Sequence, residues 1–181
     1  MDADNQQQIT LFIVEDSEVI TFGLRSVLEK VEDFKVIGSA VRAEEGITAI
    51  RRHQPQVLLL DLHLPGLDGM ECLAQLKSEF PELRVVIFSM DEDSRTVRRA
   101  FAAAADGYCA KQAPAVHVVE AIRTVMHDSW IDPGMSERIL RRESREFAVD
   151  THEPAANTDS RREKSLEALR DGLIIRPDQA C

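Results

Sequence analysis

The sequence predicts a doubly wound α/β fold with a five-stranded parallel sheet and a helical C-terminal extension. From residue 9 to residue 127, short β-rich apolar runs alternate with segments whose apolar residues recur at helical spacing. The apolar runs have no polar face, which is typical of parallel strands covered by helices on both sides. Beyond residue 127 the alternation stops, and the chain becomes charged and only weakly amphipathic.

The five repeats can be placed in order along the chain. Apolar runs rich in Val, Ile, Leu and Phe predict the strands, and the segments between them predict the helices. The third helix has a capping-box pair in Asp68 and Glu71 at its start, and Pro114 suits the first turn of the fifth. The expected strands are residues 9–15, 35–40, 56–61, 84–89 and 107–111, and the expected helices are residues 18–31, 43–53, 68–79, 92–105 and 114–127.

Four segments are expected along the chain. Residues 8–129 form the α/β domain, and residues 130–147 form a linker helix that starts near a DPG turn signal. Residues 148–159 have the polar composition of a flexible linker. Residues 160–181 are expected to form a short helical tail, an incomplete or degenerate output region, because they leave no room for another core.

The amino-acid composition and charge disfavour several classes of protein. The 181 residues include 22 Lys and Arg against 32 Asp and Glu, a net charge of -10, which disfavours a surface dominated by phosphate-binding basic residues. No apolar run has transmembrane length, and the polar start lacks signal-peptide features, so we expect a cytoplasmic protein without membrane attachment. Cys72, Cys109 and Cys181 have unrelated spacings, which argues against disulfides and a zinc site.

Polar side chains suited to chemistry occur where the expected strands end. Glu15 and Asp16 come at the end of the first strand, Asp61 ends the third, Ser89 the fourth and Lys111 the fifth. The carboxyl ends of parallel strands share one edge of the sheet, where such folds place their functional crevice. Clustered carboxylates repel one another unless a cation lies among them. A hard divalent cation, Mg²⁺, would relieve this repulsion.

These residue types suit phosphoryl transfer. That reaction needs an in-line nucleophile, a metal ion and donors for the phosphoryl oxygens. A carboxylate can be the nucleophile and form an acyl phosphate, and Asp61 is the expected phosphoacceptor. The expected metal ligands are Glu15, Asp16, Asp61 and the backbone carbonyl of His63, and the expected phosphoryl contacts are Ser89 and Lys111.

Each residue also has a plainer interpretation. Glu15 and Asp16 could simply cap the first helix. Ser89 could be a turn residue, and Lys111 could be a solvated lysine at a strand end. The side chain of His63 is expected at the surface, since only its carbonyl is needed. The joint placement on successive strand ends favours the phosphoryl-transfer interpretation.

FSMDED, GYCAKQAP and WIDPGMSERIL resemble the NarL/LuxR-type branch of two-component response regulators, and four stretches resemble the receiver domain of these regulators in general. They are IVEDS (13–17), LLLDLHLPGLDGMECL (58–73), VVIFSM (85–90) and GYCAK (107–111), and the likeness covers residues 9–127. The resemblance implies a flavodoxin-like receiver fold and phosphorylation of Asp61 by a histidine kinase with Mg²⁺. It also implies that Glu15 and Asp16 bind the metal, that Ser89 and Tyr108 are the switch residues, and that Lys111 contacts the phosphoryl group.

The resemblance also implies how the signal is read. Ser89 would move to the phosphoryl oxygen, Tyr108 would turn inward, and the face of the fourth helix, fifth strand and fifth helix would change. A downstream protein or a second copy of the chain would then bind this face. Such a domain catalyses only its own phosphorylation and dephosphorylation, and we expect His63 and Asp91 to tune water access to the phosphoryl group.

The C-terminal region departs from the NarL/LuxR pattern, in which a helix-turn-helix domain follows the receiver. Residues 160–173 resemble only its opening helix, Pro177 interrupts the next one, and no recognition helix follows. We therefore do not expect DNA binding. The alternative is a DNA-binding transcription regulator whose helix-turn-helix is truncated or degenerate in this chain. A haloacid-dehalogenase-like phosphatase is a more distant alternative, disfavoured because His63 replaces its second acid.

Overall fold

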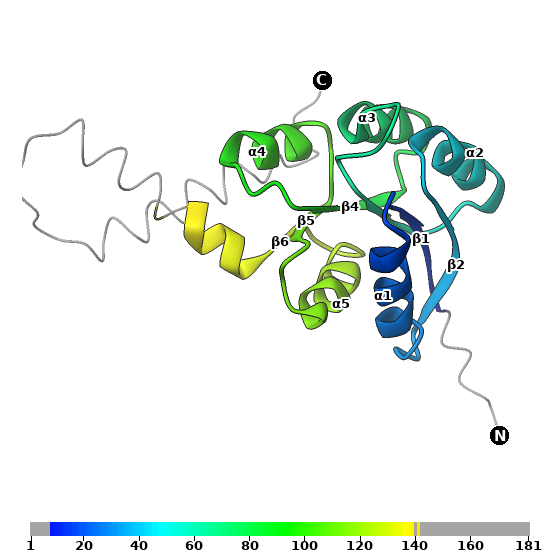
Figure 1. Ribbon diagram of the computed structural model, residues 1–181, viewed down its shortest axis with the longest axis horizontal. Coiled ribbons are helices and arrows are strands. Elements are labelled where there is room, and N and C mark those ends of the chain that lie inside the picture. Colours follow the sequence, from blue (N-terminus) through cyan, green and yellow to red (C-terminus); the bar gives the residue numbers. More distant parts are fainter. Residues whose placement is uncertain (1–7, 140, 142–181) are drawn as a thin grey trace, which may run out of the picture.

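The computed structural model describes residues 8–139 and 141. These residues form three layers, with a parallel sheet between two layers of helices (Figure 1). The strands are β1 (Ile9–Val14), β2 (Phe34–Ala40), β3 (Val57–Leu60), β4 (Arg84–Ser89), β5 (Gly107–Ala110) and β6 (Trp130–Ile131). The helices are α1 (Glu18–Leu28), α2 (Ala43–His53), α3 (Gly69–Glu79), α4 (Ser94–Ala102) and α5 (Ala115–Thr124).

The strand order explains where a site can form. It is β2-β1-β3-β4-β5-β6, and every pair is parallel. The chain moves outward in one direction from β1 to β2, and in the other from β3 to β6. The order therefore reverses between β1 and β3, and in doubly wound sheets the crevice at such a reversal binds ligands at the carboxyl ends of the strands.

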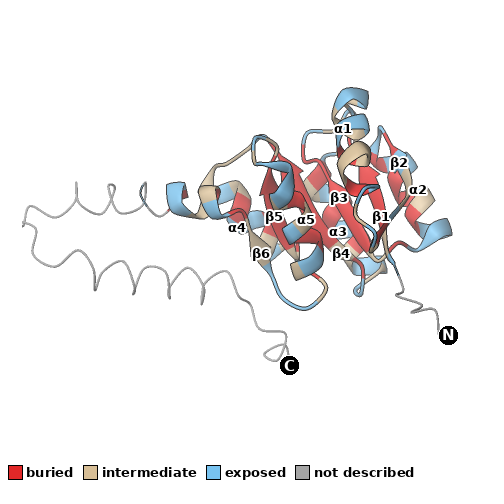
Figure 2. Cartoon of the chain, turned by 90° about the horizontal axis from the view of Figure 1, so that it is seen from below, coloured by how far each residue is buried: buried red, intermediate tan, exposed pale blue. Residues whose placement is uncertain are grey.

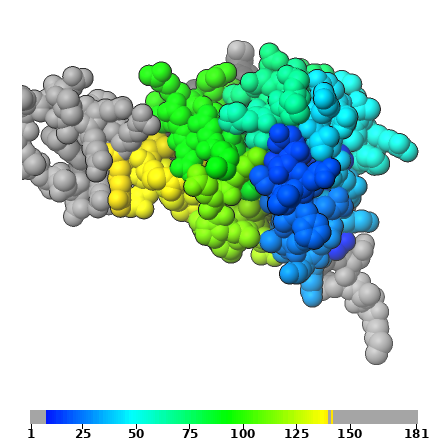
Figure 3. Space-filling view, in the orientation of Figure 1, coloured from blue at the N-terminus to red at the C-terminus, as the bar shows by residue number. Residues whose placement is uncertain are grey.

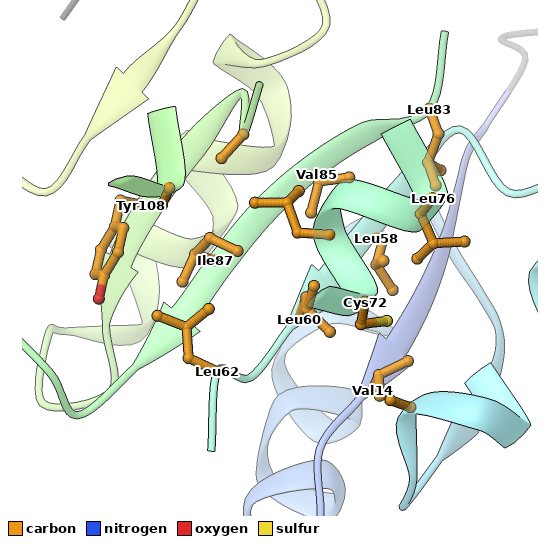
Figure 4. Close-up of a cluster of buried hydrophobic side chains, with 14 of the residues drawn as sticks. Val14, Leu58, Leu60, Leu62, Cys72, Leu76, Leu83, Val85, Ile87 and Tyr108 are labelled. Carbon is orange, nitrogen blue, oxygen red and sulfur yellow. The ribbon is translucent and has the colours of Figure 1, made fainter. Parts of the chain in front are cut away.

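Two apolar clusters hold the layers together. On one face of the sheet, α1 and α5 bury Leu24, Leu28 and Ile122 against it. On the other face, α2, α3 and α4 pack on alternate residues of the same strands, and Figure 4 shows part of this cluster, with Cys72 and Leu76 of α3 over Leu58 and Leu60 of β3. Figure 2 shows the consequence, a buried sheet beneath helices with exposed outer faces.

Cys72 and Cys109 are fully buried and unpaired, as expected of small core residues. Burial raises the pKa of each thiol to about 12, so neither forms a thiolate at neutral pH. In the described part of the chain, no helix is both long and apolar enough to cross a membrane.

The structure corrects the expected number of strands. The predicted five-stranded parallel sheet is present, and a sixth strand extends it, because Trp130 and Ile131 pair with Gly107 and Tyr108 at its edge. Residues 133–139 then form a helical segment whose Met135 is fully buried. The packed unit thus continues past residue 129, where the sequence analysis ends the α/β domain. A two-residue strand carries too few apolar residues to be recognised by periodicity. The expected linker from 148 and the tail from 160 lie outside the described residues.

The packing of Gly69 generates a stability prediction. A Cβ at this position would overlap the carbonyl oxygen of Asp61 and lie 2.5 Å from the Cα of Leu62. Both are backbone atoms that cannot turn aside, so Gly69→Ala is expected to lower the free energy of unfolding by about 1–3 kcal/mol. Urea denaturation of the full chain measures this change.

Gly23 provides the matched control. A Cβ there would meet nothing within 4 Å, and the residue lies inside α1. Gly23→Ala is therefore expected to stabilise the protein by about 0.5–1 kcal/mol through helix propensity. Equal effects of the two substitutions would show that close packing of α3 on the Asp61 segment does not constrain the fold.

Candidate functional site

Three carboxylates meet at the point where the strand order reverses. Val14 and Leu60 are paired across β1 and β3, so Glu15 and Asp61 follow directly on neighbouring strands. One carboxylate oxygen each from Glu15, Asp16 and Asp61 lies within 4.8 Å of the others. Glu15 and Asp61 are buried, whereas Asp16 is exposed. The cluster is thus rooted in the core and open to solvent on one side.

Lys111 bridges the two buried carboxylates. Its Nζ lies 2.7 Å from Oε2 and 2.9 Å from Oε1 of Glu15, and 2.9 Å from Oδ2 of Asp61. The lysine side chain is only 8% exposed. The sequence expectation of Lys111 beside the acidic residues is therefore seen directly in the geometry, and the interpretation of Lys111 as a solvated residue is wrong.

Burial and charge act in opposite directions on these groups. Burial raises the pKa of the Glu15 carboxyl, and the Lys111 amine offsets only part of that effect. Burial alone would lower the pKa of Lys111, but its bonds to Glu15 and Asp61 outweigh burial and raise it. With all groups ionised, three carboxylates face one ammonium, which leaves two negative charges in excess. Oxygen donors with excess negative charge fit a hard divalent cation.

The first helix is capped by a residue other than the acidic pair. Ser17 is the N-cap of α1, and its hydroxyl accepts a hydrogen bond from the amide of Ile20. Glu15 contributes only indirectly, since its Oε1 accepts the amide of Ser17 at 3.2 Å. Capping by Ser17 leaves Asp16 available for a ligand in the crevice.

The segment after Asp61 is held in a defined conformation. Oδ1 of Asp61 accepts the amide of His63 at 3.1 Å, while the imidazole of His63 is exposed, as expected. Glu44 of α2 accepts the amide of Leu67 at 3.3 Å, a support that the sequence analysis missed because the two residues are distant in sequence. The role of the His63 carbonyl as a metal ligand stays a prediction.

Ser89 and Tyr108 lie beside this crevice and are connected through one loop. Ser89 is fully buried at the end of β4, and its hydroxyl accepts the amide of Asp91 at 3.1 Å. Tyr108 is also fully buried, and its hydroxyl donates to the carbonyl of Asp91 at 2.7 Å. Burial raises the pKa of this phenol, which keeps it protonated. Tyr108 is therefore turned inward in this structure.

The structure shows that Asp91 has a role in the loop before α4. Its Oδ1 accepts the amide of Asp93 and its Oδ2 accepts the hydroxyl of Thr96, so the carboxylate organises the loop that leads into α4. The expected role of Asp91 in tuning water access stays a prediction. An Asp three residues before a helix that starts with Ser and Thr was the available signal for this loop role.

The raised pKa of Glu15 leads to a prediction on stability and pH. The native carboxyl binds its proton more tightly than the unfolded one, whose pKa is 4.5, so ionisation costs folding free energy as the pH rises above that value. In EDTA at neutral pH, Glu15→Gln is expected to raise Tm by about 2–4 °C, the shift that about 1 kcal/mol produces. The gain should vanish as the pH falls below 4.5, which thermal unfolding across pH measures.

Glu79 is the matched control for this effect. Arg51 holds the pKa of the Glu79 carboxyl below its usual value, so its ionised form favours the folded state. Glu79→Gln should therefore bring no gain in Tm at neutral pH. A Tm of Glu15→Gln at or below that of Glu79→Gln would contradict the electrostatic description of the cluster.

Known proteins resemble the chain over this same region. The family model of the response regulator receiver domain matches residues 11–123. Oxygen regulatory protein NreC of Staphylococcus carnosus is 29% identical over 82% of this chain and 67% of its own length. Nitrate/nitrite response regulator protein NarL of Escherichia coli is 30% identical over 65% of this chain and 55% of its own length. The chain thus spans only part of these relatives.

Solved structures agree with the fold. A LuxR-family two-component response regulator from an Aurantimonas species superimposes with a TM-score of 0.71 at 25% identity, covering 76% of this chain and 99% of that one. The isolated receiver domain of RcsB from Salmonella enterica has a TM-score of 0.68 at 22% identity, covering 72% of this chain and 97% of that one, and supports the fold alone. The match over residues 11–123 shows that the chain belongs to the response regulator receiver domain family of two-component systems.

Proposed function

We propose that Asp61 accepts a phosphoryl group from a histidine kinase in the presence of Mg²⁺. The observation that carries this proposal is the cluster of Glu15, Asp16 and Asp61 with Lys111 bridging two of them. Glu15 and Asp16 are not needed to cap α1, because Ser17 is its N-cap. The regulatory role of the family supports the same interpretation.

The phosphoryl transfer forms one bond and breaks one. A carboxylate oxygen of Asp61 attacks the phosphorus of a phosphohistidine, the O–P bond forms and the N–P bond breaks, and the imidazole leaves and takes up a proton. Mg²⁺ held by Glu15, Asp16, Asp61 and the His63 carbonyl would supply positive charge to the phosphoryl oxygens. Lys111 moves its ammonium from Asp61 Oδ2 to a phosphoryl oxygen, which its flexible side chain allows.

The hydroxyl of Ser89 donates a hydrogen bond to the transferred phosphoryl group in this proposal. Its hydroxyl oxygen accepts the amide of Asp91, and donation of its hydrogen to a phosphoryl oxygen would draw the side chain, and with it that bond, toward Asp61. The loop of residues 89–93 would then rearrange around the buried Tyr108. The change is a shift between two arrangements of this loop, with the phosphoryl charge favouring one of them.

The remaining assignments complete the proposal. The receiver comprises residues 8–129 together with β6 and the helical segment 133–139 that pack on it, and the expected linker from 148 and tail from 160 lie outside the described residues. The chain acts as a cytoplasmic regulator that catalyses only its own phosphorylation and dephosphorylation. It signals through a partner protein or a second copy that binds the face of α4, β5 and α5.

DNA binding is the second candidate function. One related structure is RcsB of Salmonella enterica bound to a promoter, of which this chain covers 60%, at 23% identity. That title describes RcsB, and the residues of this chain that could form an output region lie outside the described part. In this second candidate function, which the relatives support, the chain regulates transcription and its tail or an added segment contacts DNA.

Phosphorylation of Asp61 is testable by intact mass. The full chain incubated with Mg²⁺ and acetyl phosphate is expected to gain one phosphoryl group, and Asp61→Asn is expected to gain none, because an amide oxygen is a poor nucleophile. Asp68→Asn is the matched control, since Asn also caps α3 in place of Asp68. Equal labelling of Asp61→Asn and the parent would place the phosphoacceptor elsewhere.

The metal requirement is testable at Asp16, which is exposed and does not cap α1. Asp16→Asn removes one charged ligand, so the Mg²⁺ concentration that gives half-maximal phosphorylation is expected to rise about tenfold or more, which corresponds to about 1.4 kcal/mol. High Mg²⁺ should restore the full extent of labelling. Glu18→Gln, an exposed charge in the first turn of α1, should leave the half-maximal concentration unchanged.

A further inference from the structure

Residues 130–139, here called the cover, lie along the edge strand β5. The amide of Trp130 donates to the carbonyl of Asp106 at 3.0 Å, and the amide of Asp132 donates to the carbonyl of Tyr108 at 2.9 Å. Between these bonds, Trp130 and Ile131 pair in parallel with Gly107 and Tyr108. The cover therefore occupies the backbone groups that the edge strand would otherwise present to another chain.

The cover also packs against α4. Met135 is 0% and Ile139 is 7% exposed, and both belong to the same apolar cluster as Val97 and Ala100 of α4 and Tyr108 of β5. Figure 3 shows the cover, in yellow, directly against the green surface of α4. The cover thus lies on much of the face that the sequence analysis assigned to a partner or a second copy.

Asp132 fixes the start of the cover's helical segment. This carboxylate is 2% exposed, and its Oδ1 accepts the amide of Met135 at 3.0 Å. Its Oδ2 lies 2.8 Å from Nδ1 of His117 in α5. The His117 ring also meets the ring of Trp130 edge-on, with the centroids 6.2 Å apart. The cover is therefore anchored to α5 on one side and to α4 on the other.

The loop between β4 and α4 holds the far end of the cover. Arg138 pairs with Glu92 at 2.7 Å. Glu92 is the neighbour of Asp91, whose carbonyl accepts the Tyr108 hydroxyl and whose amide donates to Ser89. A short series of bonds therefore joins the hydroxyl of Ser89 to the helical segment of the cover.

We propose that residues 130–139 are a displaceable cover over the α4 and β5 face, and that phosphorylation of Asp61 releases it. The proposal rests on the proposed phosphorylation. When the hydroxyl of Ser89 moves toward the phosphoryl group, the loop whose Asp91 amide it accepts moves with it, and so does Glu92, the anchor of Arg138. The face of α4 and β5 then becomes available. Because such coupling is reciprocal, loosening the cover also favours the activated state by the same factor.

The single tryptophan of the chain makes the cover directly observable. Trp130 belongs to the cover, so acrylamide quenching of its fluorescence in the full chain reports whether the cover is docked. Adding Mg²⁺ and beryllofluoride is expected to raise the quenching constant about twofold or more as the docked population falls. Asp61→Asn treated in the same way should show no change.

Two arginines give a matched pair for the anchor. Arg138 pairs with Glu92 across the interface, whereas Arg141, just beyond the cover, pairs with Glu137 four residues before it and not with the loop. Arg138→Gln is expected to raise the undocking equilibrium about 2–5-fold without activation, the range for an exposed ion pair, and Arg141→Gln to leave it unchanged. The exchanged pair Glu92→Arg with Arg138→Glu should restore docking.

The outcomes separate the two proposals. Binding of beryllofluoride, followed by its ¹⁹F signal, with an unchanged or lowered quenching constant would overturn the release of the cover and leave the phosphorylation proposal intact. Absence of binding would overturn the phosphorylation proposal and the release that depends on it. Equal quenching of Arg138→Gln and Arg141→Gln would overturn the anchoring of the cover by Glu92.

Discussion

The site depends on the ion pairs that the ammonium of Lys111 makes with Glu15 and Asp61. Glu15 and Asp61 are both buried, and two adjacent carboxylates in a core would be costly without a cation between them. Lys111 reaches both, at 2.7 Å and 2.9 Å, from the end of β5. The same ion pairs connect the end of β5 to the ends of β1 and β3, so Lys111 both balances charge in the site and joins three strand ends. An added phosphoryl group or metal ion must redistribute this charge.

Much of this arrangement follows from local sequence. The buried strands are short apolar runs, and their ends differ from the expected ends by at most one residue, as in β1, which ends at Val14 instead of 15. The proximity of Asp61 and Lys111 could be predicted from the sequence, because parallel strands end at a common edge of the sheet. The inward position of Tyr108 could not be predicted in this way, since its hydroxyl donates to the carbonyl of Asp91, in a loop distant in sequence. The sixth strand was missed because its two residues gain their stability from β5, a contact distant in sequence.

The cover is joined to the rest of the receiver fold by apolar packing and by hydrogen bonds. Ile131 and Met135 complete the apolar cluster beneath α4, and Asp132 ties the same segment to α5. Because the hydroxyl of Ser89 and the anchor at Glu92 belong to one loop, a change at Asp61 has a short physical path to the chain beyond residue 130. The arrangement needs no large rigid-body motion, only a change in which of two loop conformations is favoured.

Chemical location of the acyl phosphate tests the central claim most directly. The full chain is phosphorylated with Mg²⁺ and acetyl phosphate, reduced with borohydride, which converts an aspartyl phosphate into homoserine, and sequenced by tandem mass spectrometry. The account predicts homoserine at position 61 and at no other aspartate. Homoserine at Asp16 or Asp106, or no conversion after verified labelling, would contradict it.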